Sequence, residues 1–124
     1  MGISLESIVY IFIALIAVFL LKHILPARGV RQITPAQLKN ELRIKGKQFI
    51  DVRTAGEYKS RSIRQFKNIP LHELAENTSL LSKEEEVIVI CASGMRSNKA
   101  SKLLRKLGYK RITNVKGGMN AWRG

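Results

Sequence analysis

The fold of this chain is decided by the stretch Val87-Ile88-Val89-Ile90-Cys91-Ala92-Ser93-Gly94-Met95-Arg96-Ser97. Its apolar, β-branched start predicts a buried strand over Val87–Ile90. A small turn containing glycine follows, and the apolar spacing from Ser97 to Leu107 predicts an amphipathic helix that Gly108 ends. A buried strand that passes through such a turn into a helix ends at the carboxyl edge of a sheet, where open α/β folds bind their ligands.

Cys91, the only cysteine, is the first residue after this predicted strand. We expect its thiol to face the first amides of the following helix, and both the helix dipole and Arg96 favour the thiolate form. This position predicts a nucleophile that acts on anionic substrates. The alternative is a small buried hydrophobe, which is the commoner role of a lone cysteine. A packing residue has no need of a polar turn and an arginine, so we favour the nucleophile.

Strand and helix patterns alternate on both sides of this stretch. Further strands are predicted over Val30–Ile33, Phe49–Val52, Lys67–Ile69 and Arg111–Val115. This alternation predicts an α/β fold with three layers, in which helices cover both faces of a mostly parallel central sheet of about five strands.

The helices between the strands have local start signals. Capping boxes that begin at Thr34 and Thr54 predict two of them, and Gly46 is expected to end the first. Leu71–Leu81 is predicted as one helix. The acidic segment Ser82–Glu86 is predicted as an exposed lead-in to the central strand.

The N-terminal region contains an unbroken apolar run, Ile8–Leu21. With its apolar neighbours this run is long enough to cross a hydrocarbon core, which needs about 20 residues. A cleaved signal peptide is the alternative, but no basic residue precedes the run and no small-x-small cleavage site follows it. We therefore predict an uncleaved transmembrane segment over residues 1–25, a linker over residues 26–29 and a folded domain over residues 30–124.

The charges that flank this segment predict its orientation. Lys22, Arg28 and Arg31 lie on its C-terminal side, and no Lys or Arg lies on its N-terminal side. The positive-inside rule then places the N-terminus outside and the domain in the cytoplasm. A single unpaired thiol is consistent with that reducing compartment.

The net charge of +13 comes almost entirely from the predicted domain. Three of the 22 Lys and Arg and one of the 9 Asp and Glu precede Gln32, which leaves 19 basic and 8 acidic residues. Such a surplus favours an anionic membrane surface or nucleic acid as a partner. Nucleic acid is disfavoured because the few aromatic residues do not interleave with the basic ones. The two histidines, His23 and His72, have no partner at ligand spacing, so no metal site is predicted.

Four blocks of sequence, taken in order, resemble a single rhodanese homology domain. They cover roughly Val30 to Gly124 and comprise Asp51-Val52-Arg53 with Glu57-Tyr58, Asn68-Ile69-Pro70, Cys91–Ser97, and Val115-Lys116-Gly117-Gly118 with Trp122. The resemblance implies a sulfurtransferase that needs no cofactor. Cys91 would take a sulfane sulfur from a small anionic donor such as thiosulfate, hold it as a persulfide and pass it to cyanide, a thiol or a protein.

The resemblance also implies roles for the residues around Cys91. The loop would bind substrate through Ala92, Ser93, Gly94, Met95, Arg96 and Ser97. Successive backbone amides can stabilise an anionic sulfur, and glycine permits the tight turn. Arg96 would bind an anionic donor or hold the shape of the loop. A second group, Asp51, Arg53 and Glu57, would either orient the loop or form a structural network of hydrogen bonds.

Two departures bear on this interpretation. Protein tyrosine phosphatases use C-x5-R, whereas four residues separate Cys91 from Arg96, so the smaller loop favours sulfur over phosphate. The family usually carries Gly-His-Ile-x-Gly-Ala where this chain has Arg61–Phe66, and only Ile63 matches. The added Arg61 and Arg64 suggest an acidic partner or anionic lipid. The alternative function is therefore a non-catalytic binding module that docks such a partner, although an intact Cys91 argues against it.

Overall fold

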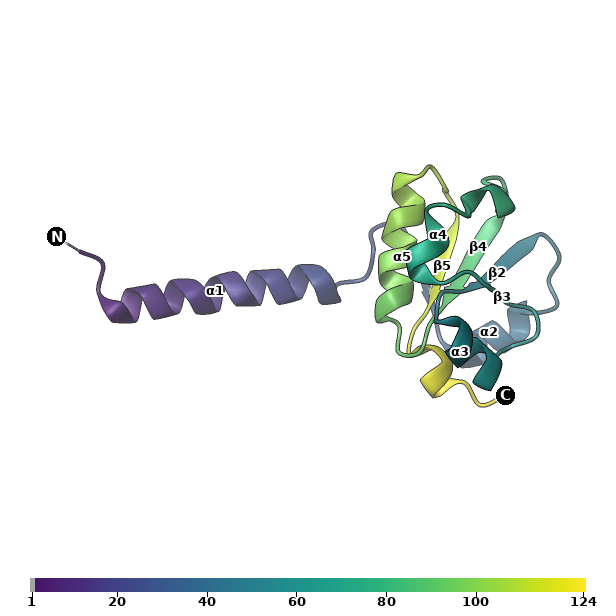
Figure 1. Ribbon diagram of the computed structural model, residues 1–124, viewed down its shortest axis with the longest axis horizontal. Helices are drawn as coiled ribbons and strands as arrows, with labels where there is room; N and C mark the ends of the chain where they lie inside the picture. The colour runs from purple at the N-terminus through teal and green to yellow at the C-terminus, as the bar shows by residue number, and fades with distance from the viewer. Residues whose placement is uncertain (1) are drawn as a thin grey trace.

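The computed structural model describes residues 2–124, apart from the side chain of Ile24, as one long helix joined to an α/β domain (Figure 1). The helix, α1 (Leu5–Ile24), begins at Ser4, whose hydroxyl accepts a hydrogen bond from the Ser7 amide. Its segment Leu5–His23 is long and apolar enough to cross a membrane, and 0% of it is buried against the rest of the chain. The apolar surface of α1 therefore has no partner within the described residues.

The domain is built on a sheet of five strands in the order β1-β5-β4-β2-β3, and every pairing is parallel. The predicted mostly parallel sheet is thus confirmed. Cys91 directly follows the central strand, so it lies in the middle of the carboxyl edge. The strands are β1 (Arg31–Ile33), β2 (Lys47–Asp51), β3 (Lys67–Asn68), β4 (Glu86–Ile90) and β5 (Ile112–Val115).

Helices cover both faces of the sheet, because the side chains of β4 alternate between two apolar clusters. Val87 and Val89 pack with the helices α4 (Leu71–Leu74) and α5 (Met95–Lys106). Ile88 and Ile90 pack on the opposite face, which is covered by α2 (Pro35–Glu41), by the 3-10 turn η2 (Gly118–Ala121) and by the segment around Phe66. The short helix α3 (Ala55–Ser60) follows β2. The three-layer prediction is confirmed.

Three predicted helix boundaries are wrong, and the strand boundaries shift by one or two residues. The segment Leu71–Leu81 is not one helix but α4 followed by the 3-10 turn η1 (Thr78–Leu80), and the Asn77 side chain caps the end of α4 by donating to the Glu73 carbonyl oxygen at 2.8 Å. α2 ends at Glu41, before Gly46, because the chain needs the intervening turn to enter β2 at Lys47. α5 begins two residues earlier than predicted, because Gly94 adopts a left-handed conformation and makes the strand-to-helix turn by itself.

Glu86 is not an exposed lead-in, as predicted, but the first residue of β4 and the centre of an ion-pair network. Its carboxylate accepts hydrogen bonds from Lys47 Nζ at 2.7 Å, Arg31 at 3.2 Å and Thr113 Oγ1 at 2.8 Å, so it links β4 to residues of β2, β1 and β5. Glu41 of α2 accepts from the same Lys47 and Arg31. Burial raises the pKa of Glu86, but the hydrogen bonds from Lys47 and Thr113 and the positive charges of Lys47 and Arg31 together outweigh it and leave this pKa below its ordinary value.

We predict that Glu86→Gln destabilises the domain by about 1–2 kcal/mol at neutral pH, because it removes the charge from these hydrogen bonds. Because folding lowers the pKa of Glu86, its ionised carboxylate stabilises the fold at pH values above 4.5, the ordinary carboxyl pKa. This stabilisation is lost as the pH falls below 4.5. The difference in melting temperature between the two proteins should therefore be largest near neutrality and shrink in acid. Thermal melts over a pH series measure this, and a difference independent of pH would contradict it.

Candidate active site

Cys91 lies fully buried at the end of β4, with two polar groups against its sulfur. The Gly94 amide donates a hydrogen bond to Cys91 Sγ at 3.0 Å. The hydroxyl of Ser97, in the first turn of α5, lies 3.2 Å from the same sulfur and also donates to the Gly94 carbonyl oxygen at 3.1 Å. The loop predicted to surround the thiol is therefore closed around it in the free protein.

The predicted substrate-binding residues are placed differently along this loop. Ser93 and Met95 are exposed and Ser97 is buried, while Ala92, Gly94 and Arg96 are half-buried. Gly94 has φ +103° and is the N-cap of α5, so its amide can turn toward the sulfur. Two cavities flank the loop: one of about 280 Å³ reaches Ser93, Gly94 and Met95, and one of about 320 Å³ is bordered by Arg96.

The turn η2 holds the other side of the loop through its backbone. The Met119 amide donates to the Cys91 carbonyl oxygen at 2.8 Å, and the Asn120 amide donates to the Ala92 carbonyl oxygen at 2.9 Å. Gly118 makes this approach possible, because a Cβ atom there would lie 2.2 Å from the Cys91 carbonyl oxygen. The sequence placed Gly117 and Gly118 only in the fourth block of the resemblance, and their contact with the loop was not predicted.

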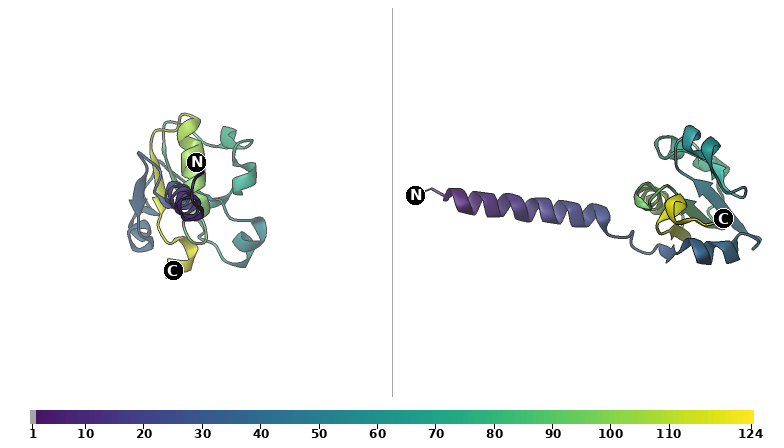
Figure 2. Two further views of the ribbon diagram at one scale, coloured as in Figure 1. Left: turned by 90° about the vertical axis from the view of Figure 1, so that its left-hand side faces the viewer. Right: turned by 90° about the horizontal axis from the view of Figure 1, so that it is seen from below.

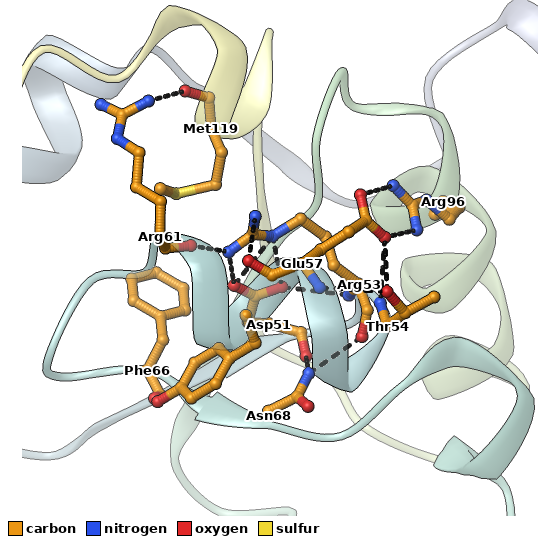
Figure 3. Close-up of polar contacts among 10 residues, drawn as sticks. Asp51, Arg53, Thr54, Glu57, Arg61, Phe66, Asn68, Arg96 and Met119 are labelled. Carbon is orange, nitrogen blue, oxygen red and sulfur yellow. Dashed lines mark hydrogen bonds and ion pairs between the residues drawn. The ribbon is translucent and has the colours of Figure 1, made fainter.

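Arg96 points toward α3 and forms a bidentate ion pair with Glu57 (Figure 3). The distances are 2.6 Å from Nη1 to Oε1 and 2.9 Å from Nη2 to Oε2. Glu57 also accepts from the Thr54 amide at 3.1 Å, which completes the predicted capping box of α3. The hydrogen bond from Arg96 holds the pKa of Glu57 down to about 2. This pair joins the loop to the first turn of α3.

Asp51 and Arg53 form a buried ion pair below α3, with Arg53 Nη2 2.8 Å from Asp51 Oδ2 (Figure 3). The same guanidinium donates to the carbonyl oxygens of Glu57, within α3, and of Arg61, which directly follows α3, so it holds the C-terminal part of this helix. Asp51 and Arg53 therefore reach the loop only indirectly, through Glu57. They form a buried hydrogen-bonded network, and its predicted role in orienting the loop stays a prediction.

Arg61 forms hydrogen bonds within the domain. Its guanidinium donates to the carbonyl oxygens of Met119 at 3.2 Å and Trp122 at 2.7 Å, although Arg61 is exposed, as Arg64 is. The segment that departs from the family pattern thus supports η2, which in turn supports the loop. Within residues 2–124 no cluster of three or more His, Cys, Asp or Glu could hold a metal ion.

We predict that Gly118→Ala is far more damaging than Gly46→Ala. Both glycines have positive φ, +53° and +82°, so both substitutions cost about 1–2 kcal/mol in backbone conformation. Only Gly118 has backbone atoms in the way, whereas nothing lies within 4 Å of a Cβ at Gly46. We expect Gly118→Ala to cost at least about 2 kcal/mol more, measured as the fall in melting temperature. Equal falls for the two variants would show that η2 does not press on the loop.

Comparison with known proteins identifies the domain. Residues 34–124 match the family described as rhodanese-like domain. The chain is 36% identical over 96 residues to the putative sulfurtransferase YtwF of Bacillus subtilis, covering 77% of this chain and 92% of that protein. It is 37% identical to a rhodanese-like domain protein from Staphylococcus aureus, whose crystal structure superposes with a TM-score of 0.70 and covers 75% of this chain and 91% of that one.

Two further relatives from Bacillus subtilis differ in extent. The uncharacterized protein YqhL is 30% identical over 117 residues, covering 94% of this chain and 91% of that protein, so the match extends into α1. The putative sulfur carrier protein YrkF is 37% identical over 75 residues, and the chain spans only 40% of its length. The chain belongs to the rhodanese-like family, and its relatives named as sulfurtransferases support sulfur transfer as its general activity.

Proposed function

We propose that this protein is a membrane-anchored sulfurtransferase that carries sulfur as a persulfide on Cys91. One observation carries the proposal: the sulfur of Cys91 lies 3.0 Å from the Gly94 amide and 3.2 Å from the Ser97 hydroxyl in a closed loop. Anionic sulfur needs hydrogen-bond donors around it, and backbone amides in a turn supply them at fixed positions. The attacking species is the thiolate itself, so no separate base is required.

The proposed reaction has two displacement steps at sulfur. The Cys91 thiolate attacks the outer sulfur of thiosulfate, a new S–S bond forms, and sulfite leaves with the electron pair of the bond that breaks. A nucleophilic acceptor, either a thiolate or cyanide, then attacks the terminal sulfur of the persulfide. The Cys91 thiolate leaves with its electron pair, and the enzyme is restored.

Ser97 has a specific place in this cycle. When Cys91 is a thiol, its S–H can donate to Ser97 Oγ while the hydroxyl donates to the Gly94 carbonyl oxygen. A thiolate has no proton to give, so the hydroxyl must turn and donate to sulfur instead. Ser97 would then stabilise the Cys91 thiolate both as the attacking species in the first step and as the leaving group in the second. Because Ser97 Oγ already lies 3.2 Å from the sulfur, this change requires only a rotation of the hydroxyl and no movement of the backbone.

The Glu57–Arg96 pair would hold the loop in this shape during turnover. Its charges compensate each other, so Arg96 presents less free positive charge to an anionic donor than an unpaired arginine would. The cavity of about 320 Å³ that Arg96 borders, together with Thr54, Pro70 and His72, is the nearest space on that side of the loop in which a donor could approach.

We also propose a location for the domain. Residues 1–25 would form a single-pass anchor, residues 26–29 a linker and residues 30–124 the catalytic domain. The N-terminus would lie outside and the domain in the cytoplasm, because Lys22, Arg28 and Arg31 all follow the apolar segment. The sulfur acceptor in this location would be a small thiol or a protein that reaches the membrane surface.

The deciding experiment is intact-mass spectrometry of the full chain in detergent after incubation with thiosulfate. We expect the wild type to gain the mass of one sulfur atom and to lose it on addition of cyanide, with release of thiocyanate. Cys91→Ser should gain nothing, and it is a close match in size. A wild type that never gains sulfur would refute the enzymatic proposal and favour the non-catalytic binding module.

We predict that Ser97→Ala slows sulfur loading by about tenfold or more, because a hydrogen bond to a charged group is worth about 1.5–3 kcal/mol. Ser97→Thr, which keeps the hydroxyl, should retain more of the rate than Ser97→Ala. The measurement is the rate at which the loaded mass appears, with the melting temperature of each variant as the control for folding. A Ser97→Ala protein that loads as fast as the wild type would remove the hydroxyl from the mechanism.

We predict that Glu57→Gln also slows loading, since it breaks the ion pair that fixes Arg96. The pKa of Glu57 is held at about 2, so its carboxylate stays ionised at and above pH 4.5, the ordinary carboxyl pKa. The ion pair is lost only as the pH falls from 4.5 toward 2. The ratio of wild-type to variant loading rates should therefore be constant from neutral pH down to the ordinary carboxyl range. A ratio that changes near neutral pH would contradict this assignment.

A further inference from the structure

The outer face of α5 carries a basic groove that the proposed reaction does not use. The groove has a volume of about 680 Å³, and its apolar floor is Ala27 and Leu103. Its other lining residues are all cationic: Arg28, Lys99, Lys102, Arg105 and Lys106. None of these five takes part in the ion pairs formed among residues 2–124. The groove is thus a concentration of uncompensated positive charge.

The linker that follows α1 is hydrogen-bonded to side chains of α5. The buried side chain of Asn98 accepts from the Ala27 amide at 2.8 Å and donates to the Leu25 carbonyl oxygen at 3.0 Å. Two groove residues bond to the same stretch of chain: Lys102 donates to the Lys22 carbonyl oxygen at 3.2 Å and Arg105 to the Gly29 carbonyl oxygen at 3.3 Å. The groove is therefore held at the point where α1 ends.

The position of α5 relative to α1 determines which way the groove faces. α5 is the element of the domain nearest to α1 and runs crosswise to it (Figure 1), and the two further views agree (Figure 2). If α1 crosses a bilayer, α5 lies along the membrane surface, and its outer face meets the headgroups. Anionic headgroups attract basic side chains near the surface.

We propose that this groove binds the headgroup phosphates of anionic phospholipids beside the end of α1. The five cationic side chains are complementary in charge to phosphate groups. Ala27 and Leu103 provide an apolar surface for the less polar part of the lipid. No aromatic residue lines the groove, so it lacks the stacking surface of a nucleic-acid site. Because α5 begins directly after the catalytic loop, lipid bound here also sets the orientation of Cys91 to the membrane. The inference rests on the proposed anchor but not on the sulfur chemistry.

The test is lysine labelling of the full chain in lipid nanodiscs, read by mass spectrometry. We compare discs of phosphatidylcholine with discs that also contain phosphatidylglycerol. In the anionic discs, labelling of Lys99, Lys102 and Lys106 should fall about fivefold, the equivalent of ~1 kcal/mol per basic side chain, and should recover at high salt. Lys39 and Lys45, exposed on and after α2 across the sheet, should label equally in both.

Matched charge reversals complete the test. Neither Lys99 nor Lys106 forms a side-chain hydrogen bond to the linker, so Lys99→Glu with Lys106→Glu should abolish the protection of Lys102 without releasing the linker. Lys39→Glu with Lys45→Glu makes the same change in charge and should leave that protection intact.

Four results would overturn the inference. Equal labelling in both kinds of disc would show that the groove does not prefer anionic lipid, and protection that persists at high salt would show that the contact does not depend on charge. Protection by inorganic phosphate in neutral discs would indicate a soluble anion instead. A chain that is not retained in discs would overturn the anchor and this inference together, whereas sulfur loading in detergent is measured independently.

Discussion

The approach of the η2 backbone to the loop after β4 is the contact on which the rest of the site depends. Gly118 lies so close to the Cys91 carbonyl oxygen that no side chain fits between them. The amides of Met119 and Asn120 then donate hydrogen bonds to the carbonyl oxygens of Cys91 and Ala92. With its carbonyls satisfied on one side, the loop can turn the Gly94 amide toward the sulfur on the other. The loop is thereby preorganised before any substrate arrives.

Local patterns in the sequence were enough to predict the parts of the site that local forces create. The apolar run before Cys91 and the capping boxes at Thr34 and Thr54 depend on neighbouring residues alone, and the structure contains them. The Glu57–Arg96 pair joins residues 39 positions apart, so its geometry follows from packing and not from spacing. The contacts of Arg61 with η2 were missed for the same reason.

α5 connects the loop after Cys91 to the linker that follows α1. Its first turn supplies Ser97, its side chain Asn98 fastens the linker, and its outer face carries the basic groove. The loop contact, the linker contact and the basic groove therefore lie on different sides of one helix of 12 residues. In the proposed membrane-anchored protein, a force on the linker would reach the loop through this one helix. The family fold alone would not require that connection, since it needs only the parallel sheet and the loop.

The preformed contact between the Gly94 amide and the Cys91 sulfur can be observed by amide hydrogen exchange and NMR of the full chain in micelles. We predict that the Gly94 amide exchanges much more slowly than that of Gly46, which lies in an open turn, and that its resonance shifts when thiosulfate is added. A Gly94 amide that exchanges as fast as that of Gly46, with a resonance that thiosulfate and Cys91→Ser both leave unchanged, would show that the loop is not built around the sulfur.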